Sequence, residues 1–199
     1  LPLSTRLLAY PAVRRGLVLV AIAAVWQAYG TWLNNDLLFP TFLQTIHALW
    51  DGIVSGEIPQ RLVVTLRTLA LGYACGIFVA AVLTTLAVSS RVGTDILTTL
   101  TAMFNPMPAI ALLPLALLWF GLGTGSLVFV IVHSVLWAVA LNTHSGFACV
   151  SDTLRMAGQT FGLKGIRFVA LILIPAAFPS IISGLKIGWA FAWRTLIAA

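Results

Sequence analysis

Long uncharged stretches divide this sequence, and their lengths predict how often the chain crosses a lipid bilayer. No charged residue lies in 16–35, in 68–90 or in 96–151, which are stretches of 20, 23 and 56 residues. About 20 apolar helical residues cross the hydrocarbon layer, so the third stretch has room for two crossings, separated by the glycine-rich segment 121–126. The pattern predicts four membrane spans, near 17–33, 64–88, 97–120 and 127–149.

Prolines modify this picture in two places. The apolar segment 168–199 contains two of them, so we expect a short helix ending near Pro175 and a fifth span from about Phe178 onward. Segment 97–120 contains Asn105 and three prolines, and the backbone groups that proline frees must be satisfied by protein or by cavity water. This span is therefore expected to face other helices or a transport pathway, with a packing kink as the alternative.

The composition and the charges agree with several crossings and exclude an ordinary soluble domain. Hydrophobic residues make up 60% of the chain and charged residues 8%, and the mean hydropathy is +1.05. Long uncharged stretches separate the basic residues, so the net charge of +6 is interpreted as a signal of membrane topology and not of nucleic-acid binding. With a cytoplasmic N-terminus, the external loops hold only Arg61, and the cytoplasmic segments hold Arg6, Arg14, Arg15, Arg91, Arg155, Lys164 and Arg167.

The ionisable residues do not converge as a membrane enzyme or a metal site requires. All five acids fall in loops or at span ends, and no histidine has a ligand partner at helical spacing. No Walker-type phosphate loop is present, so we expect neither ATP hydrolysis by this chain nor a cofactor. His133 and His144 are interpreted as interior or interfacial residues with satisfied hydrogen bonds, a ligand or proton role being the alternative. Three basic residues lie within or at the edge of apolar segments: Arg67, Lys186 and Arg194. Lys186, the deepest in its segment, is the better candidate for facing a polar interior or an anionic cargo, with snorkelling toward lipid head groups as the alternative.

Segment 151–167 predicts a short amphipathic helix on the cytoplasmic side. Ser151 or Asp152 can cap its start, and Gly162 can end it in a left-handed conformation. Three residues at helical spacing form its apolar face: Leu154, Ala157 and Phe161. Such a helix can lie on lipid head groups or insert into a groove of a soluble partner.

The same segment resembles the "EAA" loop of bacterial ABC-transporter permeases, whose pattern is E-A-A-x-x-x-G, nine residues, then I-x-L-P. The matching positions are Ala157, Gly162, Ile172 and Pro175. Met156 stands where the pattern has glutamate. The resemblance extends over roughly 60–199, with the motifs in the family's order. Within the family, this sequence resembles the nitrate, sulfonate and taurine importer branch. It is carried by the stretches Thr65–Tyr73, Asn105–Leu115, Trp119–Gly123, Phe178–Gly188 and Ala192–Trp193.

The resemblance implies an all-α, multi-span bundle of the type I (MetI-like) permease fold in a bacterial inner membrane. We expect 1–60 to hold the cytoplasmic N-terminal stretch, the first span and an external segment, and 61–199 to hold the core permease domain, truncated at its C-terminal end. The implied function is the permease subunit of an ATP-driven importer for a small anion: nitrate, a sulfonate, taurine or a similar carboxylate. The implied partners are a cytoplasmic ATPase dimer, a second and identical permease chain, and a periplasmic or lipoprotein solute-binding protein, but no nucleic acid.

In such permeases this loop docks on the ATPase, and small side chains at Ala157 and Gly162 would permit close approach. The docking residues that the resemblance implies are Asp152, Arg155, Met156, Ala157, Gly158, Phe161, Gly162 and Leu163. Asp152 is the nearest acid to replace the missing glutamate. A pathway for the anion is expected beside Asn105, Met107 and Lys186. A stand-alone carrier or channel is the main alternative, and a membrane enzyme would need His133, His144 and Asp152 to meet.

Overall fold

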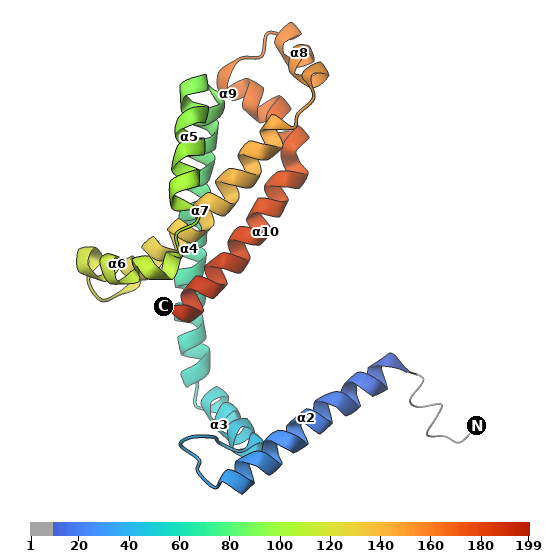
Figure 1. Ribbon diagram of the computed structural model, residues 1–199, viewed down its shortest axis with the longest axis vertical. Coiled ribbons are helices and arrows are strands. Elements are labelled where there is room, and N and C mark those ends of the chain that lie inside the picture. Colours follow the sequence, from blue (N-terminus) through green and yellow to red (C-terminus); the bar gives the residue numbers. More distant parts are fainter. Residues whose placement is uncertain (1–9) are drawn as a thin grey trace. The chain divides into compact units, whose positions relative to one another are not determined.

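The computed structural model describes residues 10–199, which form helices joined by short connections and no strand (Figure 1). The all-α prediction is confirmed, while Arg6 lies outside the described residues. The helices in chain order are α2 (Pro11–Leu33), α3 (Phe42–Val54), α4 (Glu57–Val88), α5 (Arg91–Phe104), η1 (Ala109–Leu112), α6 (Leu113–Phe120), α7 (Thr124–Ala148), α8 (Asp152–Thr160), α9 (Gly165–Phe168), η2 (Val169–Leu173) and α10 (Ile174–Ala198).

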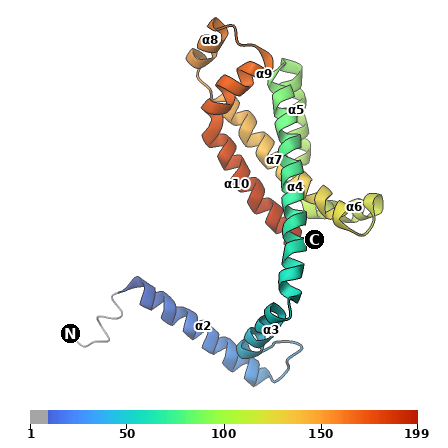
Figure 2. The same ribbon diagram turned by 180° about the vertical axis from the view of Figure 1, so that it is seen from behind.

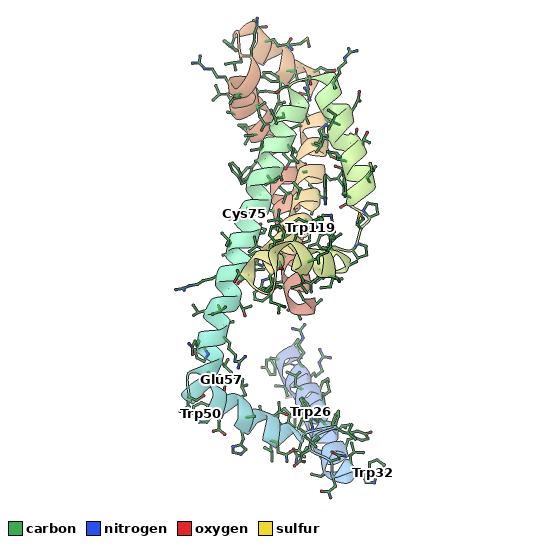
Figure 3. The ribbon with its side chains drawn as sticks, turned by 90° about the vertical axis from the view of Figure 1, so that its left-hand side faces the viewer. Trp26, Trp32, Trp50, Glu57, Cys75 and Trp119 are labelled. Atoms are coloured by element: carbon green, nitrogen blue, oxygen red, sulfur yellow. The ribbon has the colours of Figure 1, made fainter. Side chains whose placement is uncertain are left out.

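The chain divides after Val63 into two units, and the first is built on α2 and α3. The sequence pattern did not predict α3, which begins with a capping box. The Thr41 hydroxyl accepts a hydrogen bond from the backbone N–H of Gln44, and the Gln44 side-chain oxygen accepts one from the backbone N–H of Thr41. Trp26 of α2, labelled in Figure 3, donates from Nε1 to the Pro40 carbonyl at 3.0 Å. This contact fixes the connection between the two helices.

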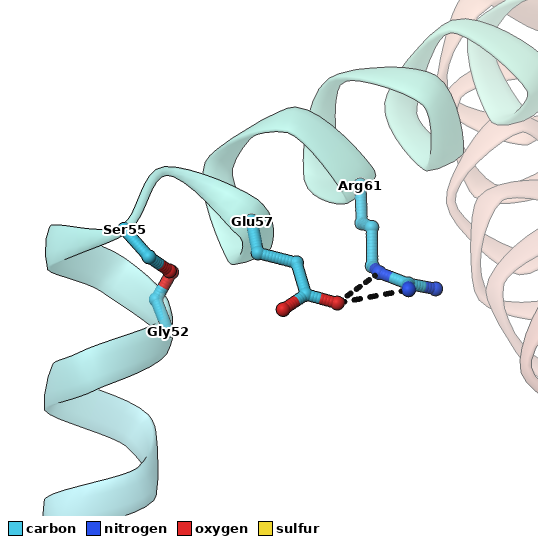
Figure 4. A network of polar contacts seen from close by, with 4 residues as sticks. All are labelled: Gly52, Ser55, Glu57 and Arg61. Atoms are coloured by element: carbon cyan, nitrogen blue, oxygen red, sulfur yellow. Dashed lines mark hydrogen bonds and ion pairs between the residues drawn. The ribbon is translucent and has the colours of Figure 1, made fainter.

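The last residues of the first unit carry one ion pair (Figure 4). Glu57 begins α4, seven residues before the predicted start of that span. Its carboxylate forms a salt bridge with the Arg61 guanidinium at 2.8 Å. Ser55 donates to the Gly52 carbonyl in the preceding turn. The two charged side chains are 63% and 78% exposed, so water screens the pair and it contributes little to stability.

The second unit packs α4, α7 and α10 together through glycines (Figures 1 and 2). A Cβ atom at Gly72 or Gly76 of α4 would lie 2.7 or 2.8 Å from Ile131 or Val135 of α7. One at Gly184 of α10 would lie 2.8 Å from the Asn142 side chain of α7. Small residues let membrane helices approach closely, because lipid offers no hydrophobic force between them and close packing must hold them.

Within residues 10–199, three helices are long and apolar enough to span a membrane: α2, α4 and α7. Two bent pairs bring the number to as many as five. The predicted span 97–120 is not one straight helix, since α5 and the η1–α6 pair meet at an 86° bend where Pro106 and Pro108 have no N–H to donate. The segments 165–176 and 178–198 meet at 80°, near the break predicted at Pro175.

Candidate functional site

The EAA-like loop, residues 151–167, lies at the end of the second unit away from the chain's C-terminus (Figures 1 and 2). Its helix α8 follows Ser151 and carries Asp152 in the first turn, where a negative charge favours the helix dipole. Gly162 follows the helix with φ 73°, and its N–H and that of Leu163 donate to the last carbonyls of α8. The predicted helix and its left-handed end are confirmed.

Arg155 ties α8 to the end of α7. Its guanidinium donates from Nε to the Val150 carbonyl at 3.2 Å and from Nη2 to the Phe147 carbonyl. The last carbonyls of a helix have no partner within it, and a cation is their preferred side-chain donor. Arg155 therefore points back into its own chain, whereas the family resemblance had placed it among the residues that dock on the ATPase.

Gly158 is the point of close approach inside the loop. It is buried, and a Cβ atom there would lie 2.9 Å from both Phe168 and Ile172. Around Gly162, by contrast, the space is open, so glycine is needed there for its left-handed backbone. Small size is thus required at Gly158 by the chain itself, whereas the expectation for Ala157 and Gly162 concerned close approach of a partner.

The outer side of the loop exposes large apolar residues. Phe161 is 82% exposed and Met156 58% exposed, and Leu154 and Ile166 are also uncovered. Leu163, Lys164 and neighbouring residues line a hollow of about 410 Å³ beside them. An apolar surface of this kind next to basic and polar residues marks a contact site for a protein or a lipid surface.

A cavity of about 420 Å³ forms where the α5–η1 connection meets α7 and α10. We call it the His133 cavity, after the histidine of α7 in its wall. Asn105 and Met107, both predicted to lie beside a pathway, also line it. Lys186 is exposed on α10 and does not line it. Arg194, on the same helix, supplies the basic side chain instead, and the sequence pattern had not selected it.

Two lining side chains lack hydrogen-bond partners. Both ring nitrogens of His133 and the indole Nε1 of Trp137 are buried without a partner among the described residues. The ring nitrogens of His133 are thus interior, as expected, but the hydrogen bonds expected for them are not formed within the described residues. The Trp137 ring stacks on Phe104 of α5 with centroids 5.6 Å apart, and it makes a T-shaped contact with the His133 ring with centroids 6.2 Å apart. These contacts hold the two unpartnered side chains in place.

A second cavity of about 300 Å³, the His144 cavity, shares Asn105 with the first. Leu141 and His144 line it from α7. His133, Trp137, Leu141 and His144 follow one another at intervals of four, four and three residues, so one face of α7 borders both cavities. Asp152 lines neither, so the structure does not bring it together with the two histidines.

These features are those of a multi-span helical membrane protein. Several helices line its cavities, and an apolar loop is exposed at one end of the second unit. Residues 72–199 match the family described as binding-protein-dependent transport system inner membrane component, and the chain belongs to this family. It is accordingly a multi-pass inner-membrane subunit of a transport system and not an enzyme. Membership also implies an ATPase and a solute-binding protein as partners.

Three relatives extend the match along nearly the whole chain. It is 31% identical to the aliphatic sulfonates transport permease SsuC of Escherichia coli, over 90% of this chain and 69% of that protein. It is 27% identical to the taurine transport system permease TauC of Escherichia coli, over 92% and 69%. It is 26% identical to the nitrate import permease NrtB of Synechocystis, over 94% and 70%. The resemblance to this branch is confirmed.

Proposed function

We propose that this chain is the permease subunit of an ATP-driven importer for a small anionic solute, such as a sulfonate, taurine, nitrate or a similar carboxylate. The names of the relatives support an anion of this kind. The basic and hydrogen-bond-donating lining of the His133 cavity supports it independently, since Arg194 lines that cavity and, within the described lining, no acidic residue does. The whole importer would contain a second permease chain and an external solute-binding protein.

The observation that carries the coupling to an ATPase is the exposed apolar side of the EAA-like loop. Met156 and Phe161 expose most of their surface to solvent, which costs free energy until a partner covers them. The loop stays in shape without that partner, because Arg155 and Gly158 tie it to its own chain. A preformed apolar helix suits a groove on a soluble subunit.

The transport cycle follows from the connection between this loop and α7. ATP-driven closure of the ATPase would move α8, Arg155 would carry the movement into the end of α7, and α7 borders both cavities. The membrane helices would then switch between inward-open and outward-open packings, and nucleotide would bias the equilibrium. Asn105, which the cavities share, and Met107 would lie beside the path. The loop end of the bundle and the N-terminus would face the cytoplasm.

Co-purification with the ATPase encoded beside this chain tests the docking step. Phe161→Asp places a charge in the exposed apolar surface and should abolish recovery of the ATPase with the permease. Leu122→Asp is the matched control, since Leu122 is 94% exposed and precedes the opposite end of α7. It should leave recovery unchanged. Gly162→Trp is a poorer probe, because φ 73° strains any side chain there.

Equal recovery of the ATPase with both variants and the parent protein would contradict docking through this loop. Recovery of no ATPase with the parent protein would remove the proposed coupling altogether and favour a stand-alone carrier. Size-exclusion profiles of the purified permeases show that each variant is folded when its recovery is compared.

A further inference from the structure

Helix α3 of the first unit exposes a continuous apolar face. Successive helical residues are rotated by about 100°, so six large apolar side chains of α3 fall on one arc of about 140°. Each of the six is between 45% and 69% exposed: Leu43, Ile46, Leu49, Trp50, Ile53 and Val54. Gln44, His47 and Asp51 lie outside this arc. The helix is therefore amphipathic, and its apolar face is left open by the described residues.

Side-chain contacts fix the start of α3 beside the last turns of α2. In addition to the hydrogen bond from Trp26, the Gln27 side-chain oxygen accepts one from the backbone N–H of Leu43 at 3.0 Å. A Cβ atom at Gly30 would lie 3.1 Å from the Thr41 backbone, so glycine permits this close approach. Gly30 lies three residues before the end of α2, which is about 4.5 Å along its axis. Helix α3 therefore begins at the level where α2 ends.

The helices on either side of α3 in the chain are candidate membrane spans. Both α2 and α4 are long and apolar enough to cross a bilayer. Helix α3 has 13 residues and is about 20 Å long, which is too short to cross a hydrocarbon layer of about 30 Å. A short amphipathic helix that starts where a span ends is placed to lie along the membrane surface, with its apolar face in the boundary between head groups and acyl chains.

The connection between α2 and α3 is also apolar and uncovered. Trp32 is 77% exposed, Leu37 99% and Leu38 75%. Tryptophan is enriched at the boundary between head groups and hydrocarbon, and Trp32 and Trp50, both labelled in Figure 3, lie at the end of α2 and within α3. Helix α3 contains neither lysine nor arginine, so its sequence favours contact with acyl chains over contact with anionic head groups.

We propose that α3 is an interfacial anchor that lies in the plane of the membrane surface. Its apolar face contacts the acyl chains of one leaflet, whatever the head-group charge, and Gln44, His47 and Asp51 face water. The anchor fixes the depth at which α2 ends and α4 begins. This inference goes beyond the proposed function and does not depend on it, because it concerns the first unit and neither the EAA-like loop nor the cavities.

Spin labels at neighbouring positions of α3 test this orientation in the purified full chain, reconstituted into phosphatidylcholine nanodiscs. The two native cysteines are first replaced by Cys75→Ala and Cys149→Ser. A nitroxide is then attached to the apolar face after Ile46→Cys and, as the matched control, to the polar face after His47→Cys. Both positions are exposed. Oxygen concentrates in hydrocarbon and a nickel chelate stays in water, so the collision rates with the two reagents report the surroundings of each label.

The label at position 46 should collide with oxygen several-fold more often than with the nickel chelate, and the label at position 47 should show the reverse. A second pair, Ile53→Cys and Asp51→Cys, repeats the comparison one to two turns later and replaces the first pair if circular dichroism shows that a label unfolds the chain. Ile22→Cys gives the reference for a lipid-facing side chain, because Ile22 is 58% exposed at the centre of α2. Phosphatidylglycerol nanodiscs should give the same ratios.

Three results would overturn the anchor. More frequent collision with the nickel chelate at positions 46 and 53 would place the apolar face in water. Infrequent collision with both reagents would show that protein covers the face, and spin–spin broadening would then identify that protein as a second copy of this chain. Equal ratios on the two faces would mean that α3 has no fixed orientation at the membrane. Recovery of the ATPase is measured separately, so none of these results bears on the proposed function.

Discussion

At the scale of single residues, two glycines of the EAA-like loop are required for different physical reasons. Gly158 has no room for a side chain, because Phe168 and Ile172 lie 2.9 Å from where its Cβ would be. Gly162 has room but adopts a left-handed backbone at φ 73°. The sequence predicted the second role from the position of Gly162 at a helix end. It could not predict the first, since the contact comes from residues ten and fourteen positions further on.

Arg155 carries a prediction at this scale. Arg155→Ala should lower the free energy of unfolding by about 1.5–3 kcal/mol, because carbonyls at the end of α7 lose a charged donor. The free energy of unfolding of the Arg155→Lys variant should lie between those of Arg155→Ala and the parent protein, since an ammonium keeps the charge without the planar fork. Thermal unfolding in detergent measures both, with Arg167→Ala, an exposed basic residue of the same loop, as the control. Equal unfolding midpoints for the Arg155→Ala and Arg167→Ala variants would contradict this role.

At the scale of elements, the interruptions between helices and their caps decide where the cavity-lining helices begin and end. The uncharged stretch 96–151 predicted two crossings and a glycine-rich break, and α7 begins at Thr124, just after two glycines with positive φ. The prolines predicted an interruption of the preceding span, and the 86° bend confirms it. The pattern did not predict α3, although Thr41 and Gln44 have the spacing of a capping box.

The break between α5 and η1 carries a prediction of its own. Replacing Pro106 and Pro108 by Ala restores two N–H donors and removes a helix-interior penalty of about 3 kcal/mol for each proline, so α5 can extend. The connection would move out of the His133 cavity, and sulfonate uptake by the importer should fall several-fold. Pro114→Ala is the control, because Pro114 lies in the first turn of α6, where proline is tolerated.

Uptake of a radiolabelled sulfonate by cells that carry the importer with each permease variant measures the proline effect. The double variant must still recover its ATPase, which shows that the EAA-like loop is intact. Uptake equal to that of the Pro114→Ala variant would mean that Pro106 and Pro108 are not needed to shape the cavity.

At the scale of the whole second unit, close contacts between α7 and α10 hold the helices that line the cavities. Gly184→Val should destabilise the bundle, since its Cβ would lie 2.8 Å from Asn142 and overpacking typically costs about 1–3 kcal/mol. Gly125→Val is the control, because a Cβ there meets its nearest neighbour, Phe120, at an ordinary 3.6 Å. Thermal unfolding measures the difference, and equal midpoints would contradict a packing role for Gly184.

The sequence by itself determined the membrane class, the approximate spans and the family. These follow from local quantities: the length of uncharged stretches, the positions of Gly and Pro, and an ordered set of motifs from Thr65 to Trp193. Each depends on neighbouring residues or on their order, and so each can be read along the chain. The amphipathic face of the EAA-like loop belongs to the same group, because helical spacing alone predicts it.

Only the tertiary structure decided which side chains meet. Lys186 and Arg194 lie on one apolar helix, eight residues apart, which rotates them by about 80° around its axis. The sequence favoured Lys186 for its depth, but of the two only Arg194 lines the His133 cavity, because the packing of α10 against α7 decides which face of α10 borders it. Asn105, His133 and Arg194 come from three segments, and no local pattern relates their positions.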